Sequence, residues 1–461
     1  MSLFLHTRSG SVAIIAATAS LMFPIRTRAQ DRPLDSLVAR AVAVNPRLRA
    51  AQHRVEVARA RIGPAGARPD PMLMAGIQNL PLGSEKTTTP NAHGTPVTTD
   101  GGPDPMTMRM LGVGQTFPYP GKLSLRRRSA VYELDAARAE ADAARLQVGR
   151  DVRRAYYDIA YAGRALEIIE RNRLVLLDVI KAAEVRYAVG NGAQSDVLRA
   201  RVEAARLGEE AVALLEERRA AVAGLNVLLD VPTETPLQRA SVPDRVARTA
   251  VSDSAAKIRF ESASLGSRAA DSPLPPLALL QARAVERSPV LRAQEAMISA
   301  QTARVELARK DHLPDFDLSL QYGQRSGRPD MITAVISLPI PIQRGSKQNQ
   351  LVAESRAELS ALGAEHSALL NEIRGDVVRL YAELERDRAQ LALYVKAIIP
   401  QGRATLESAV ANYQVARSDF LSLLDAQSTL FNYETAYFRT LTSFAKTLAE
   451  LEQVVGEEIL R

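Results

Sequence analysis

The chain has 461 residues, of which 46% are hydrophobic and 24% charged, and its formal net charge is +7. This composition is typical of an ordered protein with a large core and excludes an intrinsically disordered chain. There is no Cys, which excludes disulfide scaffolds, thiolate metal sites, thiol catalysis and an acylated N-terminal cysteine.

Residues 1–29 have the features of a secretion signal. Arg8 precedes an apolar stretch over residues 12–25, and Thr27-Arg28-Ala29 offers a small-x-small cleavage site. After this segment no stretch approaches the ~20 consecutive apolar residues that a membrane-spanning helix needs. We therefore expect a mature protein that is either soluble beyond the inner membrane or crosses a membrane as strands. The basic residues that remain alternate with acidic ones, so no nucleic-acid-binding stripe is indicated.

After residue 29, several short sequence motifs occur twice, in the same order in both halves of the chain. Asn45-Pro46 recurs as Ser288-Pro289, and Phe117-Pro118-Tyr119-Pro120 recurs as Leu338-Pro339-Ile340-Pro341. Likewise, Arg186-Tyr187-Ala188-Val189 recurs as Asn412-Tyr413-Gln414-Val415. Such ordered repetition indicates an internal duplication. We divide the chain into a first repeat over residues 30–231, a linker over 232–276 and a second repeat over 277–461.

Each repeat predicts a helix, two strands and a very long helical hairpin. No Pro occurs between Gly121 and Val231, and apolar residues in this stretch follow an alternating 4-3 spacing. The second repeat has the same spacing and is interrupted once, at Pro400, which should start a new helix or kink the old one. A sustained 3.5-residue period specifies coiled-coil packing. At 1.5 Å per residue, an arm of ~60 residues would span about 90 Å, so we expect a mainly α-helical rod or tube.

The predicted strands have one polar and one apolar face. In the second repeat Asp317, Ser319 and Gln321 alternate with Phe316, Leu318, Leu320 and Tyr322. This alternation is typical of a membrane barrel strand, and a half-buried sheet in a soluble domain is the alternative. Two strands per repeat give four per chain, whereas a closed barrel needs at least about eight. Because open edges cannot face lipid, the chain would have to oligomerise, and a trimer would form a 12-stranded transmembrane β-barrel. We interpret Ser84 to Pro105 as an exposed loop.

These residues resemble those of the TolC-type outer-membrane factors, the exit ducts of tripartite efflux and secretion systems. The resemblance runs from Leu34 to about Gly456 and leans towards the heavy-metal efflux branch. It is carried by Asn45-Pro46, by the sequence from Gln115 to Lys122, and by Tyr187-Ala188-Val189-Gly190, Leu225-Asn226, Leu313-Pro314-Asp315 and Leu423-Leu424-Asp425-Ala426-Gln427. It implies a homotrimer whose β-barrel lies in outer-membrane lipid and whose helices form an α-barrel across the periplasm.

The resemblance also implies which residues meet a partner. The partners would be a periplasmic adaptor (a membrane fusion protein) and an inner-membrane efflux transporter. The adaptor would contact the tips of the two helical hairpins, at Tyr187, Val189, Gly190 and Gly192 and at Tyr413, Val415, Ala416 and Arg417. Ala416 stands where the family usually has Gly.

Two acidic residues map to the periplasmic gate of that family, Asp425 in the second repeat and Asp196 in the first. Threefold symmetry would bring three copies of each near the axis as a cation-attracting ring. Arg199 occupies the first-repeat position that matches Asp425, so that ring is not duplicated. The alternative is that each Asp faces solvent near a helix start, where it favours the helix dipole.

Four methionines, Met72, Met74, Met108 and Met110, align with the polar, lumen-facing positions of the strands. Thioethers are soft ligands that suit Cu(I), and the alternative is that Met fills irregular space in the barrel. The five His residues have no metal-ligand spacing, and no nucleophile–base set or phosphate-binding loop occurs. We therefore assign no metal site, cofactor or enzyme activity.

The sequence thus predicts an outer-membrane exit duct of an efflux system. A type I secretion duct is the main alternative, and a periplasmic coiled-coil adaptor or scaffold is a second one.

Overall fold

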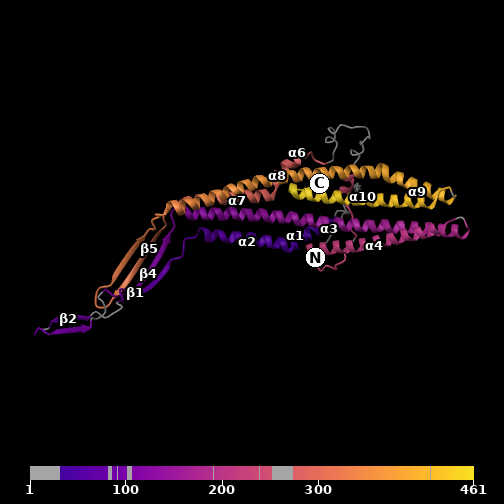
Figure 1. Ribbon diagram of the computed structural model, residues 1–461. Coiled ribbons are helices and arrows are strands. Elements are labelled where there is room, and N and C mark those ends of the chain that lie inside the picture. The colour runs from indigo at the N-terminus through magenta and orange to yellow at the C-terminus, as the bar shows by residue number, and fades with distance from the viewer. Residues whose placement is uncertain are drawn as a thin grey trace, which may run out of the picture.

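The computed structural model describes residues 32–80, 86–90, 92–100, 106–190, 192–237, 239–251, 274–415 and 417–460. The predicted secretion signal at 1–29 and the tip residue Ala416 lie outside these described residues. The chain forms an elongated helical rod with a sheet at one end. At the other end each of the two helical hairpins reverses direction (Figure 1).

The two halves of the chain have the same order of elements around the sheet. The first half contains α1 (Arg32–Val44), α2 (Pro46–Gly66), β1 (Met72–Gln78), β4 (Met108–Phe117), α3 (Lys122–Ala188) and α4 (Gln194–Leu228). The second contains α6 (Leu277–Arg287), α7 (Pro289–Lys310), β5 (Phe316–Arg325), β6 (Met331–Ser337), α8 (Asn349–Leu393), α9 (Ile399–Gln414) and α10 (Phe420–Val455). Two π-helical turns, η3 (Arg344–Gln348) and η4 (Tyr394–Ile398), flank α8, and α5 (Asp244–Ala250) lies in the linker.

The equivalent helices α2 and α7 begin in the same way. The side chain of Asn45 accepts a hydrogen bond from the N–H of Arg47 at 2.9 Å, and that of Ser288 accepts one from Leu291 at 3.3 Å. A Pro follows each cap, where its missing N–H costs no hydrogen bond.

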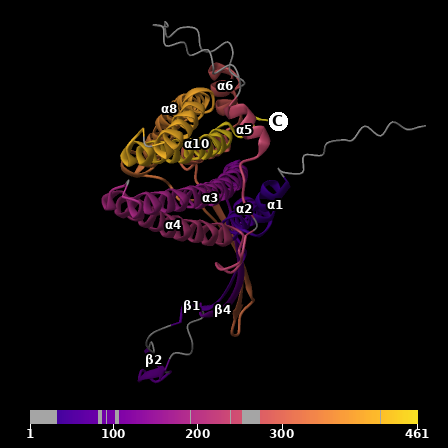
Figure 2. The same cartoon turned by 90° about the vertical axis from the view of Figure 1, so that its right-hand side faces the viewer.

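The long helices pack as the 4-3 spacing predicted. Buried members of that pattern include Val148, Val152, Ile159, Ile169, Leu176 and Ile180 on α3, Val197, Leu207 and Leu214 on α4, Val377, Leu380, Leu384 and Leu391 on α8, and Leu441, Phe444, Leu448 and Leu451 on α10. Figure 2 shows the α3–α4 pair and the α8–α10 group as two stacked layers. With 67 residues, α3 extends about 100 Å at ~1.5 Å per residue.

The expected interruption at Pro400 is confirmed. Pro400 occupies the first turn of α9, directly after η4. In η4 the N–H of Ile399 bonds to the carbonyl oxygen of Tyr394, five residues back. This wider turn makes room for a proline ring, which would clash with the carbonyl of a regular α-helix.

The main sheet has the strand order β1-β4-β5-β6, and all its neighbouring strands are antiparallel. The pairing register gives it two different faces. One face is mostly apolar and is interrupted by Arg109, Gln115 and Gln324. Its apolar members are Leu73, Ile77, Leu111, Val113, Phe117, Phe316, Leu318, Leu320, Tyr322, Ile332 and Ile336. The other face carries Gln78, Thr116, Asp317, Ser319, Gln321, Thr333 and Ser337, together with glycines, methionines and Val335. The alternation expected for β5 and β6 is therefore present in those strands, and β1 and β4 follow it less strictly.

The segment from Ser84 to Pro105, which the sequence predicts to be an exposed loop, contains two short strands in its described part. They are β2 (Lys86–Pro90) and β3 (Pro96–Asp100), which pair antiparallel as a separate ribbon. The Gly and Pro residues suggested a loop, but the Thr-rich stretches between them have the β-branched side chains that favour strands.

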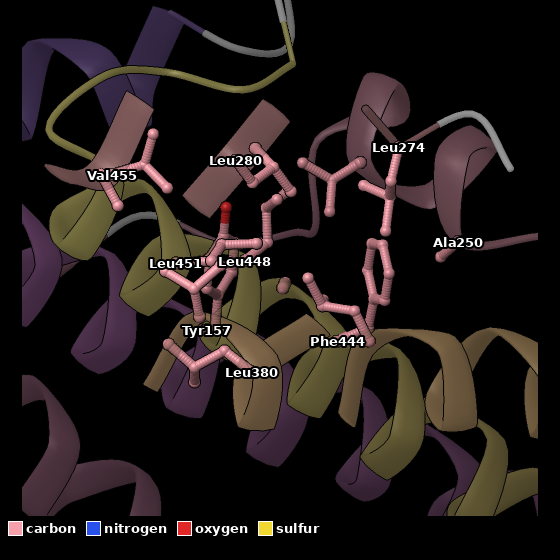
Figure 3. Close-up of a cluster of buried hydrophobic side chains, with 14 of the residues drawn as sticks. Tyr157, Ala250, Leu274, Leu280, Leu380, Phe444, Leu448, Leu451 and Val455 are labelled. Atoms are coloured by element: carbon pink, nitrogen blue, oxygen red, sulfur yellow. The ribbon is translucent and has the colours of Figure 1, made fainter. Parts of the chain in front are cut away.

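The two halves join through a hydrophobic core near the middle of the rod (Figure 3). Tyr157 of α3 lies in this core with Ala250 of the linker helix α5, Leu280 of α6, Leu380 of α8 and Phe444 of α10. The linker is thus partly folded, and it holds the two coiled-coil layers together. No helix in the described part of the chain is both long and apolar enough to cross a membrane.

A buried lysine fixes the junction between the sheet and the long helix α3. Lys122, the first residue of α3, is 4% exposed, and its Nζ lies 3.2 Å from Asp311 and 2.8 Å from Asp315. Asp315 also accepts the N–H of Tyr119 at 2.8 Å. Burial alone would raise the pKa of Asp315, but the hydrogen bonds from Lys122 and Tyr119 hold it below its usual value of 3.8. The ionised carboxylate therefore stabilises the fold fully at pH values above 3.8. This stabilisation is lost as the pH falls through the lower pKa of the folded state.

We predict that Lys122→Met lowers the free energy of unfolding by about 1–3 kcal/mol, because two partly exposed carboxylates lose their shared cation. Denaturant unfolding of the purified protein, followed by circular dichroism, measures this change. Lys347→Met, which removes an exposed lysine of η3, is the matched control and should leave stability unchanged. Equal stability of the two variants would contradict a structural role for Lys122.

Candidate functional site

The first hairpin tip is the turn between α3 and α4, at residues 189–193. Gly190 has φ +77°, in the left-handed region that favours glycine, and its N–H bonds to the carbonyl oxygen of Tyr187 at 3.0 Å. A Cβ on Gly192 would lie only 3.1 Å from the Cβ of Arg186. Both glycines are therefore required by the close reversal of the chain.

The second tip, between α9 and α10, closes by a different set of hydrogen bonds. The N–H of Arg417 donates to the carbonyl oxygen of Asn412 at 2.8 Å, a 6→1 closure of the Schellman type. Asp419 caps α10, since its carboxylate accepts the N–H of Ser422 at 3.0 Å. Hydrogen bonds from the hydroxyl and N–H of Ser422 lower the pKa of Asp419. The sequence analysis did not single out this residue, although an Asp directly before a helix is a typical capping signal.

Arg186 joins the two tips. Its Nη1 donates to the carbonyl oxygen of Tyr413 at 2.8 Å, and its guanidinium lies 4.4 Å from the centre of the Tyr413 ring. That ring also packs edge-on against Phe420 at 5.8 Å. Burial raises the pKa of the Tyr413 hydroxyl; the charge of Arg186 opposes this shift, and that of Asp196 adds to it. One arginine thus bridges the two coiled-coil layers through a charge-assisted hydrogen bond and a cation–π contact.

A cavity of about 380 Å³ separates the two turns, and it contains one of the two predicted gate residues. Asp196, in the first turn of α4, lines this cavity together with Arg186 and Asp419. Asp425 lies on an exposed face of α10 and does not line the cavity. The structure therefore places the two aspartates in different surroundings within one protomer.

The predicted adaptor-contacting residues also fall into two groups. Tyr187, Val189, Val415 and Arg417 are exposed at the tips. Tyr413 is buried, and its ring supports the turn from the inside. Tyr187, Val189 and Val415 provide apolar surface at the end of the rod, and Arg417 adds a positive charge beside it.

Further along the rod, a buried glutamate holds the two layers together. Glu434 of α10 accepts Arg171 of α3 at 3.0 Å and Arg403 of α9 at 2.9 Å. It lines a cavity of about 550 Å³ beside Val395 and Pro400, at the π-helical interruption. Sequence reasoning did not find this contact, because its three residues are far apart in the chain.

The polar face of the sheet holds more methionines than the four that the sequence indicated. The register puts Met72, Met74, Met108 and Met110 on the face of Asp317, and Met331 of β6 joins them opposite Gly323. Among the described residues, no group of three or more His, Asp or Glu could hold a metal ion.

The sequence profile of the outer membrane efflux protein family matches residues 37–230 and 280–457. Protein CyaE of Bordetella pertussis is 30% identical over 284 residues, which cover 58% of this chain and 54% of that protein. The cobalt-zinc-cadmium resistance protein CzcC of Cupriavidus metallidurans is 25% identical over 182 residues, 39% of this chain and 42% of that protein. The chain therefore spans about half the length of these curated relatives. The outer membrane protein VceC of Vibrio cholerae has the same fold, with a TM-score of 0.72 and 19% identity over 94% of this chain and 99% of that one.

We predict that Arg186→Ala lets the two tips move apart, because it removes a cation–π contact of about 0.5–2 kcal/mol and a charge-assisted hydrogen bond of about 1.5–3 kcal/mol. Since the chain has no Cys, spin labels on Val189→Cys and Arg417→Cys would be specific. Double electron–electron resonance should show a longer and broader distance distribution in Arg186→Ala. Arg201→Ala removes only the exposed ion pair with Glu184 and should leave the distribution as in the parent. The same distribution in both variants would rule out this bridge.

Proposed function

This chain belongs to the outer membrane efflux protein family, and from that premise we propose that it is the exit duct of a tripartite efflux system. It accepts cargo from an inner-membrane pump through a periplasmic adaptor and releases it outside the cell. The observation that carries the proposal is a sheet with one apolar and one polar face, continuous with a helical rod about 100 Å long. Such a molecule can surround a water-filled path through lipid and across the periplasm, and its work requires no chemical reaction.

The unpaired edges of the sheet support a trimer. β1 and β6 each have only one neighbour in the described chain, and an open edge cannot lie in hydrocarbon. Because neighbouring strands alternate in direction, β6 of one protomer can pair antiparallel with β1 of the next. Three copies of the four strands then close a 12-stranded barrel.

Apolar side chains on the helical rod also support assembly. α4 exposes Leu198, Val202, Val212 and Leu215 in a single protomer. Large apolar side chains exposed repeatedly along one helix are candidates for burial in an interface. Neighbouring protomers in a closed α-barrel would cover it.

The hairpin tips have the features of a gated entrance. Arg186 fastens the tip of α3 to Tyr413 of the second hairpin, and opening requires this contact to break as the tip helices move outward. Three copies of Asp196 and Asp425 would give the entrance a negative charge that attracts cations. The exposed Tyr187 and Val189 offer the adaptor an apolar surface.

The two halves of the chain support an origin by duplication. The family profile matches once in each half, at residues 37–230 and 280–457, which fall almost entirely within our first and second repeats. The elements of the two halves also follow one another in the same order.

We predict that Leu318→Arg prevents stable trimer assembly. Leu318 is 43% exposed on the apolar face of β5, two residues from the start of that strand. An arginine facing lipid costs up to about 2–4 kcal/mol, the full cost applying at the midplane. Ser319→Arg, one residue away on the polar face, is the control and should assemble normally, because its charge reaches water. The measurement is the yield of heat-resistant oligomer in the outer-membrane fraction. Equal assembly of both variants would favour a periplasmic scaffold whose sheet faces water on both sides.

A further inference from the structure

The methionines of this chain are concentrated on one face of the sheet. Of the nine in the sequence, Met1 and Met22 lie in the predicted secretion signal. Five of the other seven lie on the polar face of the four-stranded sheet, namely Met72, Met74, Met108, Met110 and Met331. The apolar face of the same sheet has none. A methionine that serves only as an apolar filler would be expected on both faces, so the distribution points to a use for the sulfur atom.

Three of these methionines are neighbours of Gly323 of β5. The register puts Met110 of β4 directly opposite Gly323 on one side, and Met331 of β6 directly opposite it on the other. The third, Met108, leans across the space that glycine leaves: its Sδ lies only 2.6 Å from where a Cβ on residue 323 would be. Because adjacent strands are about 4.8 Å apart, the long side chains of Met110 and Met331 can reach the same place.

We propose that Met108, Met110 and Met331 form a binding site for a soft monovalent metal ion, Cu(I) or Ag(I), as cargo in transit through the duct. The inference rests on the proposed function, since it takes the polar face of the sheet to be the lumen. Neutral thioethers prefer soft ions and bind hard ions such as Mg²⁺ and Ca²⁺ poorly. Three sulfur atoms around a glycine can surround a small ion without a carboxylate.

The position of the site fits a step on a path. Its three residues lie in the half of the sheet away from α3, because β4 runs from Met108 to Phe117 and α3 follows at Lys122. In the half nearer the helices, the methyl group of Met74 packs over Gly114, 3.4 Å from where a Cβ there would be, and Met72 pairs with Gly114 across the strands. Successive weak sites of one kind allow an ion to bind and still leave, as conduction requires.

One cation lies beside the proposed site and has its own partners. Arg325 pairs with Met108 across the strands. Its guanidinium donates to the carbonyl oxygen of Pro329 at 2.7 and 2.9 Å, in the turn between β5 and β6. The backbone N–H of Arg325 is bonded to Asp330 at 3.3 Å.

The test is titration of the purified trimer with silver nitrate in chloride-free buffer, followed by calorimetry and by X-ray absorption at the silver edge. The wild-type protein should bind its tightest Ag(I) at one site per chain with sulfur ligands, with any binding at Met72 and Met74 weaker. The test variant combines Met108→Leu, Met110→Leu and Met331→Leu. It should weaken Ag(I) binding by more than the ~10–100-fold that is typical when a residue supporting a metal ligand is lost. Gly323→Ala keeps all three thioethers but displaces the sulfur of Met108, and it should weaken binding too.

Met297→Leu on α7 is the matched control and should bind Ag(I) like the wild type. Absence of Ag(I) binding by the wild type, or equal binding by the triple variant, would overturn the inference. Conductance in planar lipid bilayers tests the proposed duct separately from the metal site. A trimer that conducts ions but does not bind Ag(I) would contradict only the metal site. A protein that forms no channel would contradict the proposed duct.

Discussion

The architecture depends on one constraint, which is that a backbone N–H or C=O facing hydrocarbon needs a partner. β1 and β6 each leave one edge without a partner in the described chain. If the apolar face of the sheet lies in lipid, as we propose, these edges must be paired by other copies. A cylinder shared between protomers would do this, and it would also place the polar face inside, cover the apolar side chains of α4 and bring the hairpin tips around one axis.

In the proposed duct the rod would extend that cylinder across the periplasm, because α3 is continuous and is held at both ends. Lys122 ties the start of α3 to Asp311 and Asp315 beside the sheet. About 100 Å away, at ~1.5 Å per residue, Arg186 ties the end of the same helix to Tyr413. Between these points Glu434 binds an arginine from each layer, next to the π-helical turn before Pro400. The two described ion pairs of Glu434 thus lie beside the interruption in the helix of the second hairpin.

Periodic patterns made much of this fold predictable from the sequence. The 3.5-residue spacing gave the long helices, the capped Asn-Pro and Ser-Pro starts gave α2 and α7, and alternation gave the faces of β5 and β6. Local patterns could not give contacts between distant residues, so the Glu434 and Arg186 bridges were missed. Met331 was missed because it is the first residue of β6, and strand ends are the least certain part of a sequence pattern. The segment of the β2–β3 ribbon was interpreted as a loop because it is rich in Thr, Gly and Pro.

The most direct measurement is oxidative cross-linking between a cysteine placed in β1 and another placed in β6 of the same chain, scanned over neighbouring registers. The chain has no Cys of its own. Within one protomer these strands are separated by β4 and β5, about 14 Å at the usual strand spacing, which is too far for a disulfide. We predict covalent trimers for the correctly registered pairs. Monomeric protein at every register, with both strands open to water-soluble thiol reagents, would contradict the shared barrel.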